Sequence, residues 1–271
     1  MDEPGAGGGL DLEALLGGVE EAVRAAGEAI IEVCGRGRIW AGLKGSDGPV
    51  TEADHAADDV LHARLMQLIP GAQWLSEESQ QVAPLIHGEP TWVVDPLDGT
   101  REFLRGLAEF GVSAALFVDD RLVLGAICLP TDGTVLGGLV NGERNIARRN
   151  GEPLAPLPED GNVGRVVVSR HDYEWRQLHY HIPFPAYPCG SAAVKLAHVV
   201  DGRAGVYLST GPRSVWDAAG GAAVLRAAGG ELLMFNGQPL ELSPQQVRIP
   251  PFAAGPRERA LALLRGLGAR I

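Results

Sequence analysis

Two aspartates at the end of a short apolar run are the residues of this sequence best suited to chemistry. The run starts at Trp92 and ends at Asp95, Asp98 follows three residues later, and the pair Gly99-Thr100 comes next. Two carboxylates this close, with a backbone carbonyl between them, suit a hard cation such as Mg²⁺. If Gly99 and Thr100 open a short helix, their amides can hold a phosphate oxygen. Asp-Pro and Asp-Gly are also common turn dipeptides, so this pattern alone leaves a plain turn open.

Three further carboxylates fall where a metal site would need them. Asp54, Glu77 and Asp217 each lie beside an apolar run, at a strand end or a helix start, where packed core would hold the side chain in place. Each also has a simpler interpretation. Asp54 and Asp217 can cap helices, which is worth about 1 kcal/mol, and Glu77 with Glu78 can form a solvated loop.

The elements that must position these residues follow from apolar periodicity and turn signals. We expect helices over Leu10–Cys34, Asp54–Leu68, Ser191–Val200, Asp217–Ala228 and Arg257–Leu267. We expect strands over Gln73–Ser76, Thr91–Val94, Gly111–Val118, Leu122–Leu129, Thr134–Val140, Arg165–Ser169, Gly205–Leu208 and Glu231–Phe235. The middle strands indicate an antiparallel meander, and the whole order indicates a layered α/β or α+β architecture.

A stretch rich in proline, glycine and acidic residues, Pro153 to Gly164, is the best candidate for a lobe boundary. We therefore divide the chain into a flexible Gly-rich tail (1–9), an N-terminal α+β lobe (10–160) that carries most of the carboxylates, and a C-terminal α/β lobe (161–271) that supplies Asp217.

The chain is acidic, with a formal net charge of −11 from 34 acidic and 23 basic side chains over 271 residues. Such a surface repels nucleic acid, and it also repels small phosphate esters unless bound cations invert the local field. No apolar run is long enough for a membrane span, and the acidic start is unlike a signal peptide. The three cysteines show no metal-ligand spacing and are expected to be reduced thiols. We expect a cytoplasmic protein with no nucleic-acid polymer and no membrane as a partner.

Four motifs give these residues a family resemblance. Asp95 to Thr100 match Asp-Pro-hydrophobic-Asp-Gly-Thr, and Trp216 to Gly220 match Trp-Asp-x-Ala-Gly. Val-Thr-x-x-Asp, ending at Asp54, and Glu-Glu-Ser, starting at Glu77, lie upstream in the expected order. Over nearly its whole length the chain resembles the inositol monophosphatase superfamily of lithium-sensitive, Mg²⁺-dependent phosphatases. The resemblance implies an α+β fold, a layered αβαβα sandwich.

The resemblance also implies roles for single residues. Glu77, Asp95 and the carbonyl of Leu97 would hold a first Mg²⁺. Asp95 would bridge to a second ion completed by Asp98 and Asp217, and a third, weaker ion would rely on Glu77. Asp54, bonded to Thr100, would help to orient and deprotonate the attacking water. The resemblance thus implies Glu77, Asp54 and Thr100 as catalytic residues and two or three ions in the site.

Within the superfamily, the sequence looks most like the 3'(2'),5'-bisphosphate nucleotidases of the CysQ type. The pointers are Arg-Glu-Phe after Thr100, Ser-Arg-His from Ser169, and the Gly-Pro that starts at Gly211 before the Trp-Asp pair. Members that prefer inositol tend to place a glutamate where this chain has Thr210. The implied substrate is 3'-phosphoadenosine 5'-phosphate, a small phosphorylated metabolite that would be hydrolysed to AMP and phosphate.

The expected substrate contacts are Gly99, Thr100, Ser191, Lys195 and Arg213. Lys195 is the candidate for the phosphate that is not cleaved, and a solvated helix lysine is the alternative. Ser191 and Lys195 are four residues apart, which looks more like the Gly-Thr-Ala-Ala-Val run of inositol monophosphatases. Phosphatases of inositol, histidinol or fructose phosphates therefore stay open, as does a non-catalytic phosphate-binding regulator. The sequence is compatible with a monomer or a homodimer.

Overall fold

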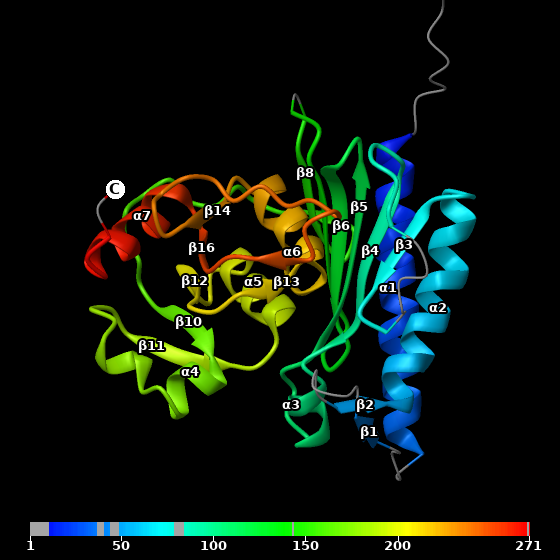
Figure 1. The fold of residues 1–271 in the computed structure, drawn as a ribbon, viewed down its shortest axis with the longest axis horizontal. Coiled ribbons are helices and arrows are strands. Elements are labelled where there is room, and N and C mark those ends of the chain that lie inside the picture. Colours follow the sequence, from blue (N-terminus) through cyan, green and yellow to red (C-terminus); the bar gives the residue numbers. More distant parts are fainter. Residues whose placement is uncertain (1–10, 37–40, 44–48, 79–83, 143, 270) are drawn as a thin grey trace, which may run out of the picture.

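The computed structural model of the chain describes residues 11–36, 41–43, 49–78, 84–142, 144–269 and 271 (Figure 1). The helices are α1 (Leu12–Gly35), α2 (Glu52–Leu68), α3 (Thr100–Leu104), α4 (Arg170–Glu174), the 3₁₀ turn η1 (Leu178–Tyr180), α5 (Ala192–Val200), α6 (Val215–Ala227) and α7 (Arg257–Gly266). The strands of the first half are β1 (Ala41–Leu43), β2 (Pro49–Thr51), β3 (Gln73–Ser76), β4 (Thr91–Asp98), β5 (Gly111–Val118), β6 (Arg121–Leu129), β7 (Thr134–Leu139), β8 (Ile146–Arg149) and β9 (Glu152–Pro153). Those of the second half are β10 (Val166–Ser169), β11 (Ala186–Cys189), β12 (Val206–Ser209), β13 (Arg213–Ser214), β14 (Glu231–Met234), β15 (Arg248–Ile249) and β16 (Phe252–Gly255).

Two large sheets organise the described part of the chain. One has seven strands in the order β3-β4-β5-β6-β7-β8-β9, and the other has five in the order β11-β10-β12-β16-β14. The first is antiparallel except for the pair β3 and β4. In the second, β11, β10 and β12 are parallel, so their carboxyl ends meet at one edge. Such an edge is where α/β sheets commonly place functional side chains.

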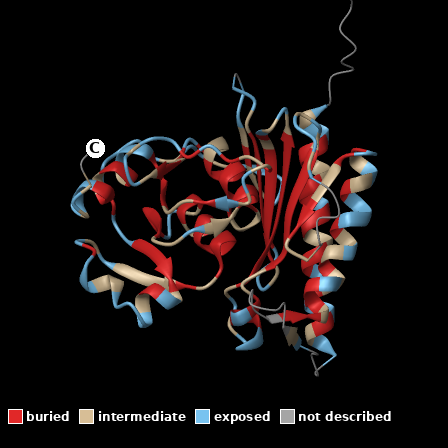
Figure 2. Cartoon of the chain, in the orientation of Figure 1, coloured by how far each residue is buried: buried red, intermediate tan, exposed pale blue. Residues whose placement is uncertain are grey.

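The layers alternate between helix and sheet. In Figure 1, α1 and α2 cover one face of the seven-stranded sheet, and α5 and α6 lie between that sheet and the five-stranded one. The helix α7 packs on the far face of the second sheet, against β16 and β14. Figure 2 shows that the seven-stranded sheet and the helix faces against it are buried. The expected layered αβαβα fold of the α+β class is confirmed.

The close approach of α6 to the first sheet depends on small residues. A Cβ on Gly138 of β7 would lie 2.4 Å from the Cα of Val224, and a Cβ on Gly220 would lie 2.7 Å from the carbonyl oxygen of Ala126. Side chains larger than hydrogen at these positions would push the helix away from the sheet. This contact fixes α6, and α6 carries Asp217 in its first turn.

Most expected elements are found within a few residues of their predicted ends, with two instructive differences. The second helix begins at Glu52 rather than Asp54, because the side chain of Thr51 caps it by accepting a hydrogen bond from the Ala53 amide. The strand expected to end before Asp95 continues to Asp98 through an irregularity in its pairing with β5. Several short elements were not predicted, among them the strands β8, β11 and β16 and the helix α4.

Candidate active site

Three of the predicted carboxylates meet at one point between the two sheets. Among the described residues, Glu77, Asp95 and Asp217 each offer a carboxylate oxygen, and these oxygens all lie within 4.8 Å of one another. Glu77 follows β3, and its amide donates to the carbonyl of Val94 in the parallel neighbour β4. Asp95 belongs to β4 itself, and Asp217 comes from the far side, at the N-terminal end of α6. Three separate elements therefore supply one acidic cluster.

The cluster has unfavourable electrostatics when it holds no cation. Burial raises the pKa of Asp95, which is 1% exposed, and the charges of Glu77, Asp98 and Asp217 raise it further. Burial, followed by the charges of Asp98 and Glu77, raises the pKa of Asp217 to about 7. Oxygen ligands of this kind are the ones that Mg²⁺ takes in proteins. The donor set therefore fits Mg²⁺, whose charge would offset the repulsion.

Asp98 lies beside this cluster and is held by the N-terminal end of α5. Its Oδ2 accepts hydrogen bonds from the Ser191 hydroxyl and from the Ala193 amide, both at 2.6 Å. The Ser191 hydroxyl also accepts from the Val194 amide at 3.1 Å and so caps the helix. Ser191, predicted to contact substrate, thus contacts a predicted metal ligand in this structure.

The predicted pair Asp54 and Thr100 is formed across two elements. The Thr100 hydroxyl lies 3.0 Å from Asp54 Oδ1 and 3.1 Å from the Leu97 carbonyl oxygen, and both contacts are buried. The other oxygen of Asp54 accepts from the amide and the hydroxyl of Thr51, at 2.7 and 2.6 Å. Asp54 therefore completes the capping box of α2, as the simpler interpretation held, and also bonds Thr100.

Gly99 makes the turn that presents this threonine. Its φ is +100°, in the left-handed region that favours glycine, and it is the N-cap of α3. A Cβ here would lie 2.6 Å from the Glu109 carbonyl oxygen, so the position has no room for a side chain. The short helix that was expected to begin at Gly99 and Thr100 is present as α3.

Lys195 was expected either to contact the uncleaved phosphate or to be a solvated helix lysine. Its side chain is buried, with 1% of its surface exposed, and its Nζ donates to the carbonyls of Cys189 and Gly190 at 3.1 and 2.8 Å. The solvated helix lysine is therefore wrong. In this structure the ammonium is directed at the backbone of the turn before α5, and a direct contact of Lys195 with a substrate phosphate stays a prediction.

Arg213 lies near enough to the acidic cluster to feel its charges. Its Nε donates to Ser209 Oγ at 3.1 Å, at the end of β12. Its pKa is raised by Tyr207 and, to a smaller extent, by the carboxylates of Asp217 and Asp98. This cation thus stays near the predicted metal ligands, on the side of the C-terminal lobe.

Two residues to which the sequence assigned no role in the site join the same region: Glu109, and Arg170, which stood only in the Ser-Arg-His pointer. Glu109 accepts a hydrogen bond from the Gly190 amide at 2.8 Å and forms an ion pair with Arg170. Glu109 stands two residues before β5, and Arg170 directly follows β10. Their positions at strand ends were the only sign in the sequence that they could belong to the site. That sign is useful only once the strands are known to end near Asp98.

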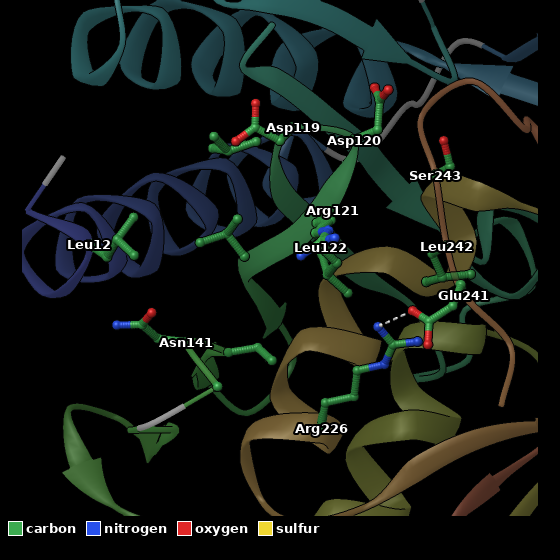
Figure 3. A pocket seen from close by; sticks show the side chains of 14 residues that line it. Leu12, Asp119, Asp120, Arg121, Leu122, Asn141, Arg226, Glu241, Leu242 and Ser243 are labelled. Atoms are coloured by element: carbon green, nitrogen blue, oxygen red, sulfur yellow. Dashed lines mark ion pairs between the residues drawn. The ribbon is translucent and has the colours of Figure 1, made fainter. Parts of the chain in front are cut away.

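A large cavity of about 1450 Å³ lies away from the carboxylates (Figure 3). It is lined by Val118 at the far end of β5 and by Arg226 in the last turn of α6, which pairs with Glu241. Arg226 lies nine positions after Asp217 in α6, a rise of about 14 Å along the helix axis. The cavity is therefore not part of the acidic site.

The fold and the acidic site define a phosphatase of the inositol monophosphatase superfamily. Residues 11–266 match the inositol monophosphatase family, and the chain belongs to it. It is 31% identical over 243 residues to the 3'(2'),5'-bisphosphate nucleotidase CysQ of Escherichia coli K12, covering 88% of this chain and 97% of that protein. It is 29% identical to inositol monophosphatase 1 of Solanum lycopersicum, covering 87% and 90% of the two chains.

Solved structures share the fold. The extragenic suppressor protein SuhB of Bartonella henselae superposes with a TM-score of 0.77 at 24% identity, over 95% of this chain and all of that one. A 2'AMP-bound structure of SaIMPase-II gives a TM-score of 0.73 at 22% identity, over 95% and 96% of the two chains. In the described residues, no helix combines the length and apolar character needed to cross a membrane.

Proposed function

We propose that this chain hydrolyses 3'-phosphoadenosine 5'-phosphate to AMP and phosphate with Mg²⁺ as its cofactor. The observation that carries the chemistry is the cluster of Glu77, Asp95 and Asp217, in which the pKa values of Asp95 and Asp217 are raised. The choice of substrate is supported by the 31% identity to bisphosphate nucleotidases over 88% of the chain. It is also supported by Thr210, which stands where inositol-preferring members tend to have a glutamate.

Two or three Mg²⁺ ions would be held by this set of oxygens. Glu77, Asp95 and the carbonyl of Leu97 would hold the first, and Asp95, Asp98 and Asp217 the second, with Glu77 serving a third. When bound, Mg²⁺ supplies Lewis-acid stabilisation of the phosphoryl oxygens and makes water easier to deprotonate.

The pair Asp54 and Thr100 would act on the attacking water. Because the Thr100 hydroxyl donates to Asp54, its oxygen lone pairs are left to accept a hydrogen bond from water. That bond would orient the water oxygen toward phosphorus, and the water proton would pass by way of Thr100 to Asp54. The new bond forms between the water oxygen and phosphorus, the ester P–O bond breaks, and the leaving oxygen takes a proton from solvent. No covalent phosphoenzyme is needed.

Arg213 would bind the phosphate that is not cleaved. It lies on the C-terminal side of the acidic cluster, near the carboxylates of Asp217 and Asp98. Guanidinium groups bind phosphate with two parallel hydrogen bonds. Ser191 would lie beside this phosphate at the N-terminal end of α5, with its hydroxyl proton still donated to Asp98. The amides of Gly99 and Thr100 would hold the cleaved phosphate.

The competing substrate is inositol 1-phosphate, favoured by the 29% identity to a plant inositol monophosphatase. Phosphate release with Mg²⁺ from equal concentrations of the two compounds tests the proposal directly. The nucleotide should be hydrolysed with a kcat/KM at least about tenfold higher, a difference of about 1.4 kcal/mol in transition-state binding. An equal or higher kcat/KM for inositol 1-phosphate would overturn the proposed substrate but not the phosphatase class.

A further inference from the structure

The peptide unit of Gly190, in the turn between β11 and α5, is held from several sides. Its amide donates to Glu109 Oε2 at 2.8 Å, and its carbonyl accepts from Lys195 Nζ at 2.8 Å. A Cβ at this position would lie 2.0 Å from Cδ of Glu102, so that carboxylate packs directly on the glycine. Charged side chains from α3, from the segment before β5 and from α5 thus converge on one glycine.

Lys195 is an unusual member of this group because it is charged and buried. Its Nζ also donates to the Cys189 carbonyl at 3.1 Å and lies 5.1 Å from the centre of the Tyr207 ring. The carboxylate of Glu102 is close enough for the lysine charge to lower its pKa, although burial outweighs that effect. A buried ammonium is costly unless hydrogen bonds satisfy it, and here backbone carbonyls satisfy it.

The turn whose carbonyls bond Lys195 is followed directly by the residues that bond Asp98. Ser191 and Ala193, the next residues along, bind Asp98 Oδ2 through a hydroxyl and an amide at 2.6 Å each. Both bonds use the same carboxylate oxygen, so the other is the one that can face a cation. The position of the turn therefore decides how the Asp98 carboxylate is rotated.

We propose that Lys195 is a positioning residue for the metal site: by fixing the carbonyls of Cys189 and Gly190, it sets Ser191 and Ala193 so that Asp98 is oriented to bind Mg²⁺. Lys195 acts through the backbone and does not touch the substrate. This inference rests on the proposed function, because Asp98 is taken there as a metal ligand. Groups that orient metal ligands commonly change metal affinity by 10- to 100-fold when removed.

The test is Mg²⁺ affinity, measured by calorimetry on metal-stripped protein. Lys195→Met keeps the length of the side chain and removes its charge, and we expect the Kd for Mg²⁺ to rise about tenfold. Ser191→Ala should raise it similarly. In the double variant the two effects should not add, since both act on the same contact to Asp98. Additive effects, or a wild-type Kd in Lys195→Met, would overturn the proposal.

Arg149→Met is the matched control. Arg149 is also a long cation that anchors α5, but it pairs with Asp201 at the other end of the helix, at 2.9 Å. Its loss should leave the Kd for Mg²⁺ unchanged, and an equal rise in Kd would mean that Lys195 only stabilises α5 in general.

Glu109→Gln carries the test if Lys195→Met does not fold, as judged by circular dichroism. It keeps an acceptor for the Gly190 amide but removes the charge that strengthens the bond, so the Kd should rise about threefold. A wild-type Kd there would contradict the proposal. Phosphate release is measured on the same samples. A wild-type protein that binds Mg²⁺ but releases no phosphate from the nucleotide refutes the proposed function alone.

Discussion

At the scale of single residues, the Thr100 hydroxyl can be removed without removing a predicted metal ligand. It bonds Asp54 and the Leu97 carbonyl, and it is not a predicted metal ligand. Thr100→Val keeps the shape of the side chain and removes the group that would orient water. We expect kcat to fall by about 100-fold or more, while the Kd for Mg²⁺ stays within about twofold of wild type.

Thr91→Val is the control for that variant. Thr91 is also a buried threonine, at the opposite end of β4, and its hydroxyl donates to the Glu89 carbonyl. Steady-state phosphate release by both variants measures the difference. Full activity in Thr100→Val, or an equal loss in Thr91→Val, would show that Thr100 has no part in the reaction.

The Asp217 carboxyl should make the metal-free protein less stable as the pH rises. Its pKa is about 7 in the folded chain and about 3.9 when unfolded. A raised folded pKa means that its stabilising contribution is complete below about pH 4 and is lost as the pH rises through about 7. We expect Tm in EDTA to fall between pH 4 and 8. The fall should be shallower in Asp217→Asn, and an unchanged or steeper fall would contradict the assignment.

At the scale of elements, the contact of α6 with the first sheet determines where Asp217 lies. Gly138→Ala would place a methyl group 2.4 Å from the Cα of Val224, against backbone that cannot yield cheaply. We expect a loss of about 1–3 kcal/mol of unfolding free energy, together with reduced phosphatase activity. Urea denaturation measures the first effect.

Gly17→Ala is the matched control, because it makes the same substitution at an uncrowded helix position. Among the described residues, no atom outside the local backbone of α1 lies within 4 Å of a Cβ at Gly17, so alanine should stabilise the helix by about 0.5–1 kcal/mol. If both variants were destabilised alike, crowding between α6 and the sheet would not be the reason for the effect at Gly138.

How far the sequence could lead is clearest from particular elements. The motif from Asp95 to Thr100 and the pair of Asp54 with Thr100 were predictable, because short-range spacing and the family resemblance carry them. The inward direction of Lys195 was not, since a lysine on a helix gives no sign of which carbonyls it can reach. Glu109 was missed, and Arg170 was named only in the Ser-Arg-His pointer. The bonds that Glu109 makes to the Gly190 amide and to Arg170 join residues 81 and 61 positions apart in the chain, which short-range spacing does not reveal.

At the scale of the whole molecule, the two predicted lobes share their hydrophobic core. One cluster of buried side chains includes Val93 and Phe117 of the first sheet as well as Val167 and Tyr207 of the second. The lobe boundary near residue 160 stays a prediction, and so does the choice between monomer and homodimer.

Because the core is shared, the chain should unfold as one cooperative unit. Urea unfolding followed by circular dichroism and by tryptophan fluorescence should give coincident transitions. Two separated transitions would mean that the halves are stable independently, and that the site between them is held less firmly than this structure indicates.

The central claim is that the buried carboxylates hold Mg²⁺ for phosphoester hydrolysis. Its most direct test is phosphate release by wild type and by Asp95→Asn, each with EDTA and with added Mg²⁺, from a mixture of 3'-phosphoadenosine 5'-phosphate and inositol 1-phosphate. Wild type should be inactive in EDTA and active with Mg²⁺. Asp95→Asn should stay folded by circular dichroism, because a neutral amide relieves the repulsion that raises the Asp95 pKa, yet lose at least about 1000-fold in rate, roughly 4 kcal/mol. A folded Asp95→Asn protein that turns over at the wild-type rate would contradict the claim.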